Sequence, residues 1–153
     1  MFVTSPTVQA PENAIENDGF FPDIEMASFR DENRIDATVS TLRLRHCIIN
    51  HVLAVNRQLA VFKAAQLAAG VNSLEDIDAP EIDGKNTYTH YYMRAVGSLV
   101  KAEVIEKYRD FDTTTAGRET ADQLAPNIEE LRRNAYWAIS DILGSPRSNV
   151  ELI

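Results

Sequence analysis

Residues 41–70, TLRLRHCIINHVLAVNRQLAVFKAAQLAAG, decide the fold of this chain. Their apolar side chains recur every three or four positions, which is the spacing of one face of an α-helix. The recurring positions are Leu44, Ile48, Val52, Val55, Leu59 and Phe62, and Ile49 and Leu53 widen the same stripe. Ser40 can cap the N-terminus by accepting a backbone N–H, and Gly70 supplies a left-handed stop. The pattern predicts one helix of about 45 Å, at 1.5 Å per residue.

Two further runs repeat this spacing, and each predicts another long helix. The second run holds Tyr88, Tyr91, Tyr92, Ala95, Leu99, Ala102, Ile105 and Tyr108, and the third holds Leu124, Ile128, Leu131, Ala135, Ala138 and Ile142. The second helix should start close to Thr87, and the third should end at Gly144. Pro126 should either kink the third helix or delay its start to about residue 126. Three apolar stripes predict an all-α fold, a small helical bundle with three long helices.

The sequence divides into an extended N-terminal arm (1–22), a helical bundle domain (23–144) and a short C-terminal tail (145–153). The arm lacks periodicity, but it ends in two adjacent aromatic residues, Phe20 and Phe21. Each should gain about 1.5 to 3 kcal/mol when covered, so they should anchor the arm. A short helix through about Asn33 should follow, capped by Asp23.

Three apolar residues of this short helix, Ile24, Ala27 and Phe29, should face inward. The segment 71–86 reads as an acidic loop, with one helical turn near residues 73–77. Residues 147–153 are short and partly apolar, and they should form a strand or a tail that docks on another chain.

Composition excludes several classes of protein. The chain has 153 residues, of which 44% are apolar, and this suffices for one domain. Its formal charge of −8 argues against a surface that binds duplex DNA. No segment is apolar enough to span a membrane, and no secretory signal precedes the domain, so we expect a soluble protein made in the cytoplasm. One cysteine, Cys47, allows no intramolecular disulfide and should be buried packing.

No constellation of residues predicts catalysis or a cofactor. His46 and His51 are five residues apart, whereas two metal ligands on one helix face are four apart, so we predict no metal site. The acidic run 75–78 lacks the glycine and the terminal glutamate of a calcium loop. The tyrosines of the second run lack the basic groove of a nucleic-acid stacking platform, so core packing is expected. We therefore expect no enzyme, no cofactor and no metal.

An ordered set of short segments resembles a known family. The segments are Phe20-Phe21-Pro22-Asp23-Ile24, Ala68-Ala69-Gly70, Ile82-Asp83-Gly84, Tyr92-Met93-Arg94-Ala95-Val96, Glu106-Lys107-Tyr108-Arg109, Trp137-Ala138 and Gly144-Ser145-Pro146-Arg147. They resemble the head completion (head stabilisation) proteins, the L-type proteins of peduovirus-like contractile-tailed phages, over residues 20–153. Lys107, in place of an arginine, and Pro126 depart from the family pattern.

The resemblance implies a structural head-to-tail connector located in the virion neck. It implies a homo-oligomeric ring of about twelve copies below the portal protein, which stabilises packaged DNA and offers a docking surface to a tail terminator or tail completion protein. Twelve copies would carry a formal charge of about −96. An acidic lumen would let genomic DNA pass without specific binding. The alternative is a generic acidic helical interaction module or chaperone unrelated to the virion.

Two groups of contact residues follow from this reading. The portal-binding residues should be Pro146, Arg147, Val150 and Ile153. The residues that anchor the arm, on the same subunit or on an adjacent one, should be Phe20, Phe21, Pro22 and Ile24.

Overall fold

The computed structural model describes residues 11–111 and 115–147, with side-chain surroundings given for 11–107 and 127–147. The elements in chain order are α1 (Met26–Glu32), α2 (Thr41–Gln58), α3 (Ala60–Ala68), the 3-10 helix η1 (Leu74–Asp76), β1 (Glu81–Ile82), β2 (Lys85–Asn86), α4 (Thr87–Phe111) and α5 (Thr115–Leu143). The described chain is therefore mostly helical, as predicted, with one small antiparallel hairpin that the all-α prediction did not include.

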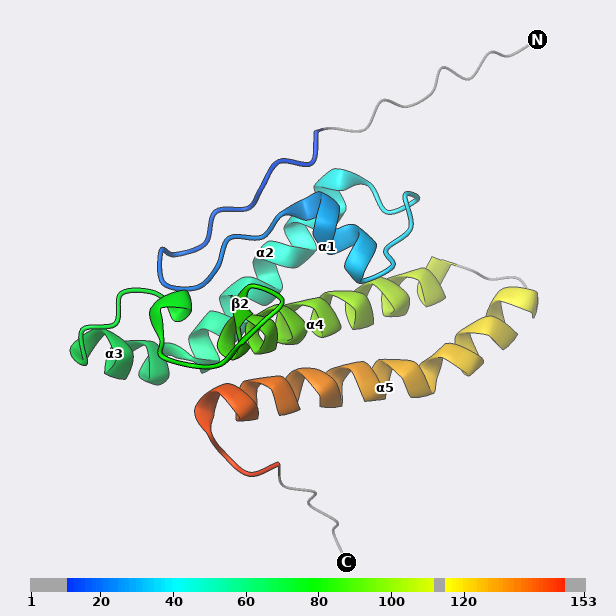
Figure 1. Cartoon of the computed structure of the whole chain (residues 1–153). Helices are drawn as coiled ribbons and strands as arrows, with labels where there is room; N and C mark the ends of the chain where they lie inside the picture. The colour runs from blue at the N-terminus through cyan, green and yellow to red at the C-terminus, as the bar shows by residue number, and fades with distance from the viewer. Residues whose placement is uncertain (1–10, 112–114, 148–153) are drawn as a thin grey trace, which may run out of the picture.

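Helix α4 is the centre of the fold. Figure 1 shows it between α2 on one side and the antiparallel α5 on the other. Tyr92, Ala95, Val96 and Val100 of α4 are fully buried, and they share one hydrophobic core with residues of α2 and with Ala138, Ile139 and Ile142 of α5. The apolar stripe of α4 is thus covered from both sides, which confirms that the tyrosine-rich run packs in the core.

The predicted single helix over 40–70 is wrong in one respect, because the chain bends at Leu59. Leu59 has φ −97° and ψ 8°, and it separates α2 from α3. Its N–H still donates to Val55 O (3.0 Å) and its carbonyl still accepts from the N–H of Lys63 (2.9 Å), so the backbone turns without opening. The bend leaves Leu59 fully buried. Of the three long helices predicted, the first is two shorter helices of 18 and 9 residues.

The predicted helix ends are largely confirmed. Ser40 caps α2 by accepting the N–H of Arg43 (3.3 Å). Gly70 follows α3 with φ +86°, and the N–H of Val71 donates to Gln66 O (3.0 Å), which is a Schellman motif. Gly144 ends α5 with φ +69°. Helix α4 begins at Thr87 as expected.

The short helix α1 ends at Glu32, with Asn33 as its C-cap, close to the predicted end. Its N-terminal boundary is not capped by Asp23, because the N-cap is Glu25, which makes no side-chain cap bond. The Asp23 carboxylate instead accepts the N–H of Asn17 (2.7 Å). Ile24 and Phe29 are buried as predicted, but Met26 and not Ala27 faces the core.

The loop 71–86 contains the predicted helical turn, now η1, and a hairpin that was not predicted. Its strands pair Glu81 with Asn86 and Ile82 with Lys85. The turn residues Asp83 and Gly84 have φ +53° and +75°, which is the conformation of a type I′ turn. This hairpin delivers the buried Asn86, whose side chain caps α4 by accepting the N–H of Thr89 (2.9 Å).

Pro126 does not delay the last helix, since α5 begins at Thr115 and runs without a break to Leu143. The delayed start is therefore wrong. Figure 1 shows the α5 ribbon curving between its yellow and orange parts, and a kink at Pro126 itself stays a prediction.

Gly97 of α4 lies against the side chain of Asn33, the C-cap residue of α1. A Cβ at this position would lie 2.5 Å from Oδ1 of Asn33, and the Nδ2 of Asn33 donates to Phe29 O at 2.9 Å. A side chain at position 97 must therefore displace the C-cap of α1.

We predict that Gly97→Ala destabilises the protein by about 1 to 2 kcal/mol in urea unfolding, although alanine is the better helix former. In an Asn33→Ala background the Asn33 side chain no longer blocks a Cβ at position 97. The same Gly97→Ala change should then stabilise the protein by about 0.5 to 1 kcal/mol. Equal effects of Gly97→Ala in the two backgrounds would show that the contact is unimportant.

Candidate interaction surfaces

The aromatic pair predicted to anchor the N-terminal arm is buried in the same chain. Phe20 and Phe21 are each 3% exposed, and Ile24 is 1% exposed, while Pro22 is half-buried. The ring of Phe21 stacks on Tyr92 of α4 with centroids 4.9 Å apart. Ile24 also forms an antiparallel bridge with Ile15. The segment from residue 15 onward is thus part of the folded domain.

A closed set of polar contacts holds this segment in register. The hydroxyl of Tyr92 donates to Oδ1 of Asn56 on α2 (2.7 Å) and accepts from Nδ2 of Asn17 (2.8 Å). The Nδ2 of Asn56 donates in turn to Oδ1 of Asn17 (2.9 Å). Burial raises the pKa of Tyr92, so its hydroxyl keeps the proton that it donates. The three side chains therefore join the N-terminal segment, α2 and α4.

Asp18 makes the turn that presents the aromatic pair. Its Oδ1 accepts the N–H groups of Phe20 and Phe21 (3.0 Å each), and its Oδ2 accepts from Nζ of Lys63 on α3 (2.8 Å). Burial alone would raise the pKa of Asp18, but the bonds from Lys63 and from the two backbone N–H groups outweigh it and lower the pKa. The carboxylate form is therefore the one that holds the turn.

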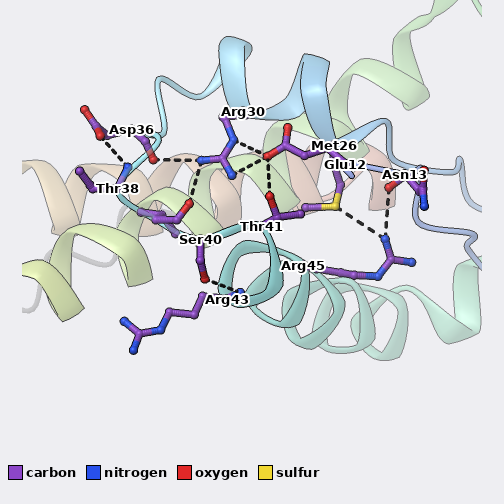
Figure 2. A network of polar contacts seen from close by, with 11 residues as sticks. Glu12, Asn13, Met26, Arg30, Asp36, Thr38, Ser40, Thr41, Arg43 and Arg45 are labelled. Carbon is purple, nitrogen blue, oxygen red and sulfur yellow. Dashed lines mark hydrogen bonds and ion pairs between the residues drawn. The ribbon is translucent and has the colours of Figure 1, made fainter. Parts of the chain in front are cut away.

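Figure 2 shows a second polar network, at the start of the described chain. Glu12 accepts from Nε of Arg30 on α1 (2.7 Å) and from Oγ1 of Thr41 on α2 (3.3 Å). The same guanidinium donates to the carbonyls of Asp36 (2.9 Å) and Val39 (3.1 Å). This arginine therefore joins Glu12 to the second half of the α1–α2 connection.

The C-terminal end of α5 carries an arginine and tryptophan cluster. Arg147 makes a two-bond contact with Asp141 (2.7 and 3.3 Å). The guanidinium carbons of Arg147 and Arg133 lie 4.9 and 4.6 Å from the ring centroid of Trp137. Arg147 is thus held on its own chain, and neighbouring Pro146 is exposed. The other two expected portal contacts, Val150 and Ile153, lie outside the described residues.

One side of α2, which we call the α2 face, is left exposed. It consists of Leu42, Arg43, Ile49, Leu53 and Arg57, and its leucines are 69% and 63% exposed. The prediction that Ile49 and Leu53 widen the buried stripe is therefore wrong. The two arginines form no ion pair with any described residue. The segment 41–68 contains no Asp or Glu at all, although the whole chain has a charge of −8.

Five acids lie close together in the segment 75–83, which we call the acidic loop. Its exposed acids are Glu75, Asp76, Asp78, Glu81 and Asp83. None of them forms an ion pair within the part of the chain that the structure describes. Ile82, at the hairpin turn, is 61% exposed among them, and its carbonyl contacts Nε2 of His90 on α4 (2.6 Å). The hairpin therefore holds an apolar residue within a negatively charged surface.

A third polar group lies between α2 and α4. Cys47, expected to be simple packing, is buried, and its thiol donates to Oε2 of Glu103. His51 lies one turn along α2 with its Nε2 3.4 Å from the same oxygen, whereas His46 is exposed. Burial raises the pKa of Cys47 to about 12 and lowers that of His51. The sequence signal for this group was the four-residue spacing of Cys47 and His51.

Comparison with known proteins identifies the family. The profile of the phage head completion protein family (GPL) matches residues 15–153. The chain belongs to this family. It is 36% identical over 151 residues to the head completion/stabilization protein of Escherichia phage P2, covering 99% of this chain and 89% of the relative. It is 26% identical over 144 residues to a probable head completion/stabilization protein of Haemophilus phage HP1 (strain HP1c1), covering 93% of each. No solved structure matches.

Membership of the phage head completion protein family confirms the resemblance drawn from the short segments. It gives the chain a structural role in the completion of the phage head, and with it an association with the virion. Such a role argues against a catalytic function. Among the helices that the structure describes, none combines the length and the apolar character of a membrane span.

We predict that Asp18→Asn lowers stability at neutral pH by about 0.5 to 1 kcal/mol, because the ion pair with Lys63 is lost. The lowered pKa means that Asp18 stabilises the fold above its unfolded pKa of 3.8 and that this contribution disappears as the pH falls through the folded value. The free energy of unfolding, measured in urea, should therefore decrease less between pH 7 and pH 3 in the variant than in the natural protein. In the Asp18→Asn background, Lys63→Met should cause no further loss of stability. If Lys63→Met lowers stability as much in that background as in the natural protein, the pairing of Asp18 with Lys63 is contradicted.

Proposed function

We propose that this chain is a head-to-tail connector whose copies form a ring below the portal protein, stabilise the packaged DNA and offer a docking surface to a tail terminator or tail completion protein. The observation that supports it is the family match over residues 15–153, with the P2 head completion/stabilization protein as a relative of nearly equal length. The predicted number of about twelve copies and the site in the virion neck belong to this proposal.

A ring of identical subunits requires two different surfaces that fit each other, since each copy contacts the next one head to tail. The α2 face and the acidic loop are two such surfaces. One is apolar and carries two arginines that form no ion pair with a described residue, and the other is acidic around the exposed Ile82. We propose that the α2 face of one subunit binds the acidic loop of its neighbour.

The chemistry of the two surfaces favours this pairing. Leu42 and Leu53 would be covered by a neighbour, which removes exposed apolar area at about 25 cal/mol per Å². Arg43 and Arg57 at the edge of these leucines would meet the carboxylates of the acidic loop. Opposite charges at the edge of an apolar contact orient the partners and exclude wrong ones. The leucines would then supply most of the binding free energy, and the charges would fix the orientation of the two subunits.

The acidic character of the rest of the chain bears on the path of DNA. With a charge of −8 per copy, a ring is strongly negative, and we propose that its lumen repels the DNA phosphates so that the genome passes without specific binding. Using Arg43 and Arg57 between subunits would keep these cations away from that path.

The buried aromatic anchor takes a same-subunit role in this proposal. Phe20, Phe21 and Ile24 contact their own chain, and Phe21 stacks on Tyr92. The anchor would then hold each subunit in the shape that the ring requires, and Pro22 would direct the chain from the aromatic pair into α1.

For portal binding we propose the C-terminal tail. Arg147 is fixed by Asp141 and Trp137, so Pro146 and Arg147 leave α5 in a defined direction. Residues after Arg147, including Val150 and Ile153, would then pack on the portal. In this arrangement Arg147 aims the tail, and the apolar residues beyond it make the contact.

We predict that Arg43→Glu with Arg57→Glu abolishes ring formation, because the reversed charges face the acidic loop of the neighbour. Glu75→Lys with Asp78→Lys should do the same. An equimolar mixture of the two double variants should restore rings, since every contact then joins opposite charges again. The measurement is negative-stain imaging and light scattering of the protein with purified portal.

The matched control for this experiment is Arg34→Glu with Arg94→Glu, two exposed arginines outside the α2 face, which changes the net charge equally and should leave rings intact. Rings that tolerate Arg43→Glu with Arg57→Glu would refute the pairing of the two surfaces. Intact rings that fail to retain DNA would instead assign the α2 face to DNA.

We predict that deletion of residues 147–153 abolishes portal binding while the helical circular dichroism signal is unchanged. Val150→Asp with Ile153→Asp in the full chain should weaken binding at least about tenfold, because truncation or charging of an apolar anchor removes about 2 kcal/mol or more. Ser148→Asp with Asn149→Asp is the control of equal charge. Portal binding that survives the deletion would show that the contact lies elsewhere.

A further inference from the structure

The junction of α2 and α4 brings three metal-ligating side chains together. The Sγ of Cys47, the imidazole of His51 and the carboxylate of Glu103 each have one ligand atom within 4.8 Å of the other two. A thiolate, an imidazole and a carboxylate are the ligands that Zn²⁺ takes in proteins. The side chains of His51 and Glu103 are 23% and 26% exposed, whereas Cys47 is buried. An ion can therefore reach the group through His51 and Glu103.

The backbone holds the ligands at metal-binding spacing. Cys47 and His51 are four residues apart on α2, which places both side chains on one face of the helix. Glu103 faces them from α4. The 3.4 Å between Nε2 of His51 and Oε2 of Glu103 matches the separation of about 3.4 Å between two ligand atoms that each lie about 2.1 Å from a tetrahedral zinc.

Two further observations distinguish this group from an ordinary polar contact. The Nε2 of His51 is buried and makes no hydrogen bond of good geometry, since it lies 3.4 Å from Oε2 of Glu103. A buried polar atom with so weak a contact needs an explanation, and a bound ion would provide one. In addition, Nζ of Lys107 lies 3.2 Å from Oε1 of Glu103, which leaves Oε2 directed at Cys47 and His51. Outer contacts of this kind orient the ligands of metal sites.

We propose that Cys47, His51 and Glu103 bind one Zn²⁺ between α2 and α4, with water as the fourth ligand. On binding, the Cys47 thiol releases its proton to solvent, and Sγ, Nε2 of His51 and Oε2 of Glu103 each donate a lone pair to the ion. The thiolate and the carboxylate balance the two positive charges. The ion joins α2 to α4 at a point separate from the Tyr92 contacts, and the site does not depend on ring formation.

The test uses Co²⁺ as a spectroscopic probe on the full chain, without a histidine tag. Cobalt bound to a thiolate gives a near-ultraviolet charge-transfer band, and Cys47 is the only cysteine that can produce it. We expect a band that saturates at one Co²⁺ per chain and disappears when Zn²⁺ is added. Zn²⁺ should also raise the midpoint of thermal unfolding.

Variants assign the ligands. Cys47→Ser should abolish the band, and His51→Asn or Glu103→Gln should weaken Co²⁺ binding at least about tenfold. His46→Asn is the matched control, because His46 lies exposed on the same helix and should change nothing. If Cys47→Ser does not fold, His51→Asn provides the test. Loss of the zinc-dependent thermal shift in His51→Asn supports the site, and an unchanged shift contradicts it. Failure of the natural protein to bind Co²⁺ or Zn²⁺ at one per chain, or binding that only His46→Asn removes, would overturn the proposal.

Discussion

The described fold depends most on the two hydrogen bonds of the Tyr92 hydroxyl. Its ring is fully buried, so its polar atom must find partners inside the protein, and Asn17 and Asn56 provide them. Those two asparagines belong to the N-terminal segment and to α2. One buried phenol therefore sets the positions of three segments that are distant in sequence, and the stacking of Phe21 on its ring adds apolar contact to the same place.

The surfaces available to partners follow from the central position of α4. Because α4 is covered by α2 on one side and by α5 on the other, each outer helix buries one face and presents another. The exposed side of α2 carries arginines in a segment without acids, while the acids lie in the N-terminal segment, in the loop before α4 and along the last third of the chain. A chain of strongly negative charge thus still has a local positive surface, which total charge alone conceals.

Features set by neighbouring residues could be predicted from the sequence, whereas features set by distant contacts could not. Ser40, Gly70 and Gly144 act within one turn of a helix end, so their predicted roles hold. The bend at Leu59 has no glycine or proline that could predict it, and Leu59 is fully buried at this point. The Asp83-Gly84 turn was a readable hairpin signal, but strands of two residues show no alternation.

The same distinction applies to the candidate site. The four-residue spacing of Cys47 and His51 could be seen in the sequence, but their third partner is on another helix. Glu103 is 56 positions from Cys47, and its four-residue spacing from Lys107 is typical of an ion pair on an exposed helix face. That ion pair exists, yet the second oxygen of the carboxylate faces inward. Only the register of α2 against α4 could reveal this.

The bend at Leu59 has a consequence for the helix beyond it. No residue of α3 is fully buried, and Val61 is 84% exposed. Helical segments with so little buried area open locally at a small fraction of the free energy of global unfolding, so their amide hydrogens exchange early. The amide hydrogens of α3 should therefore exchange before those of the core around Tyr92.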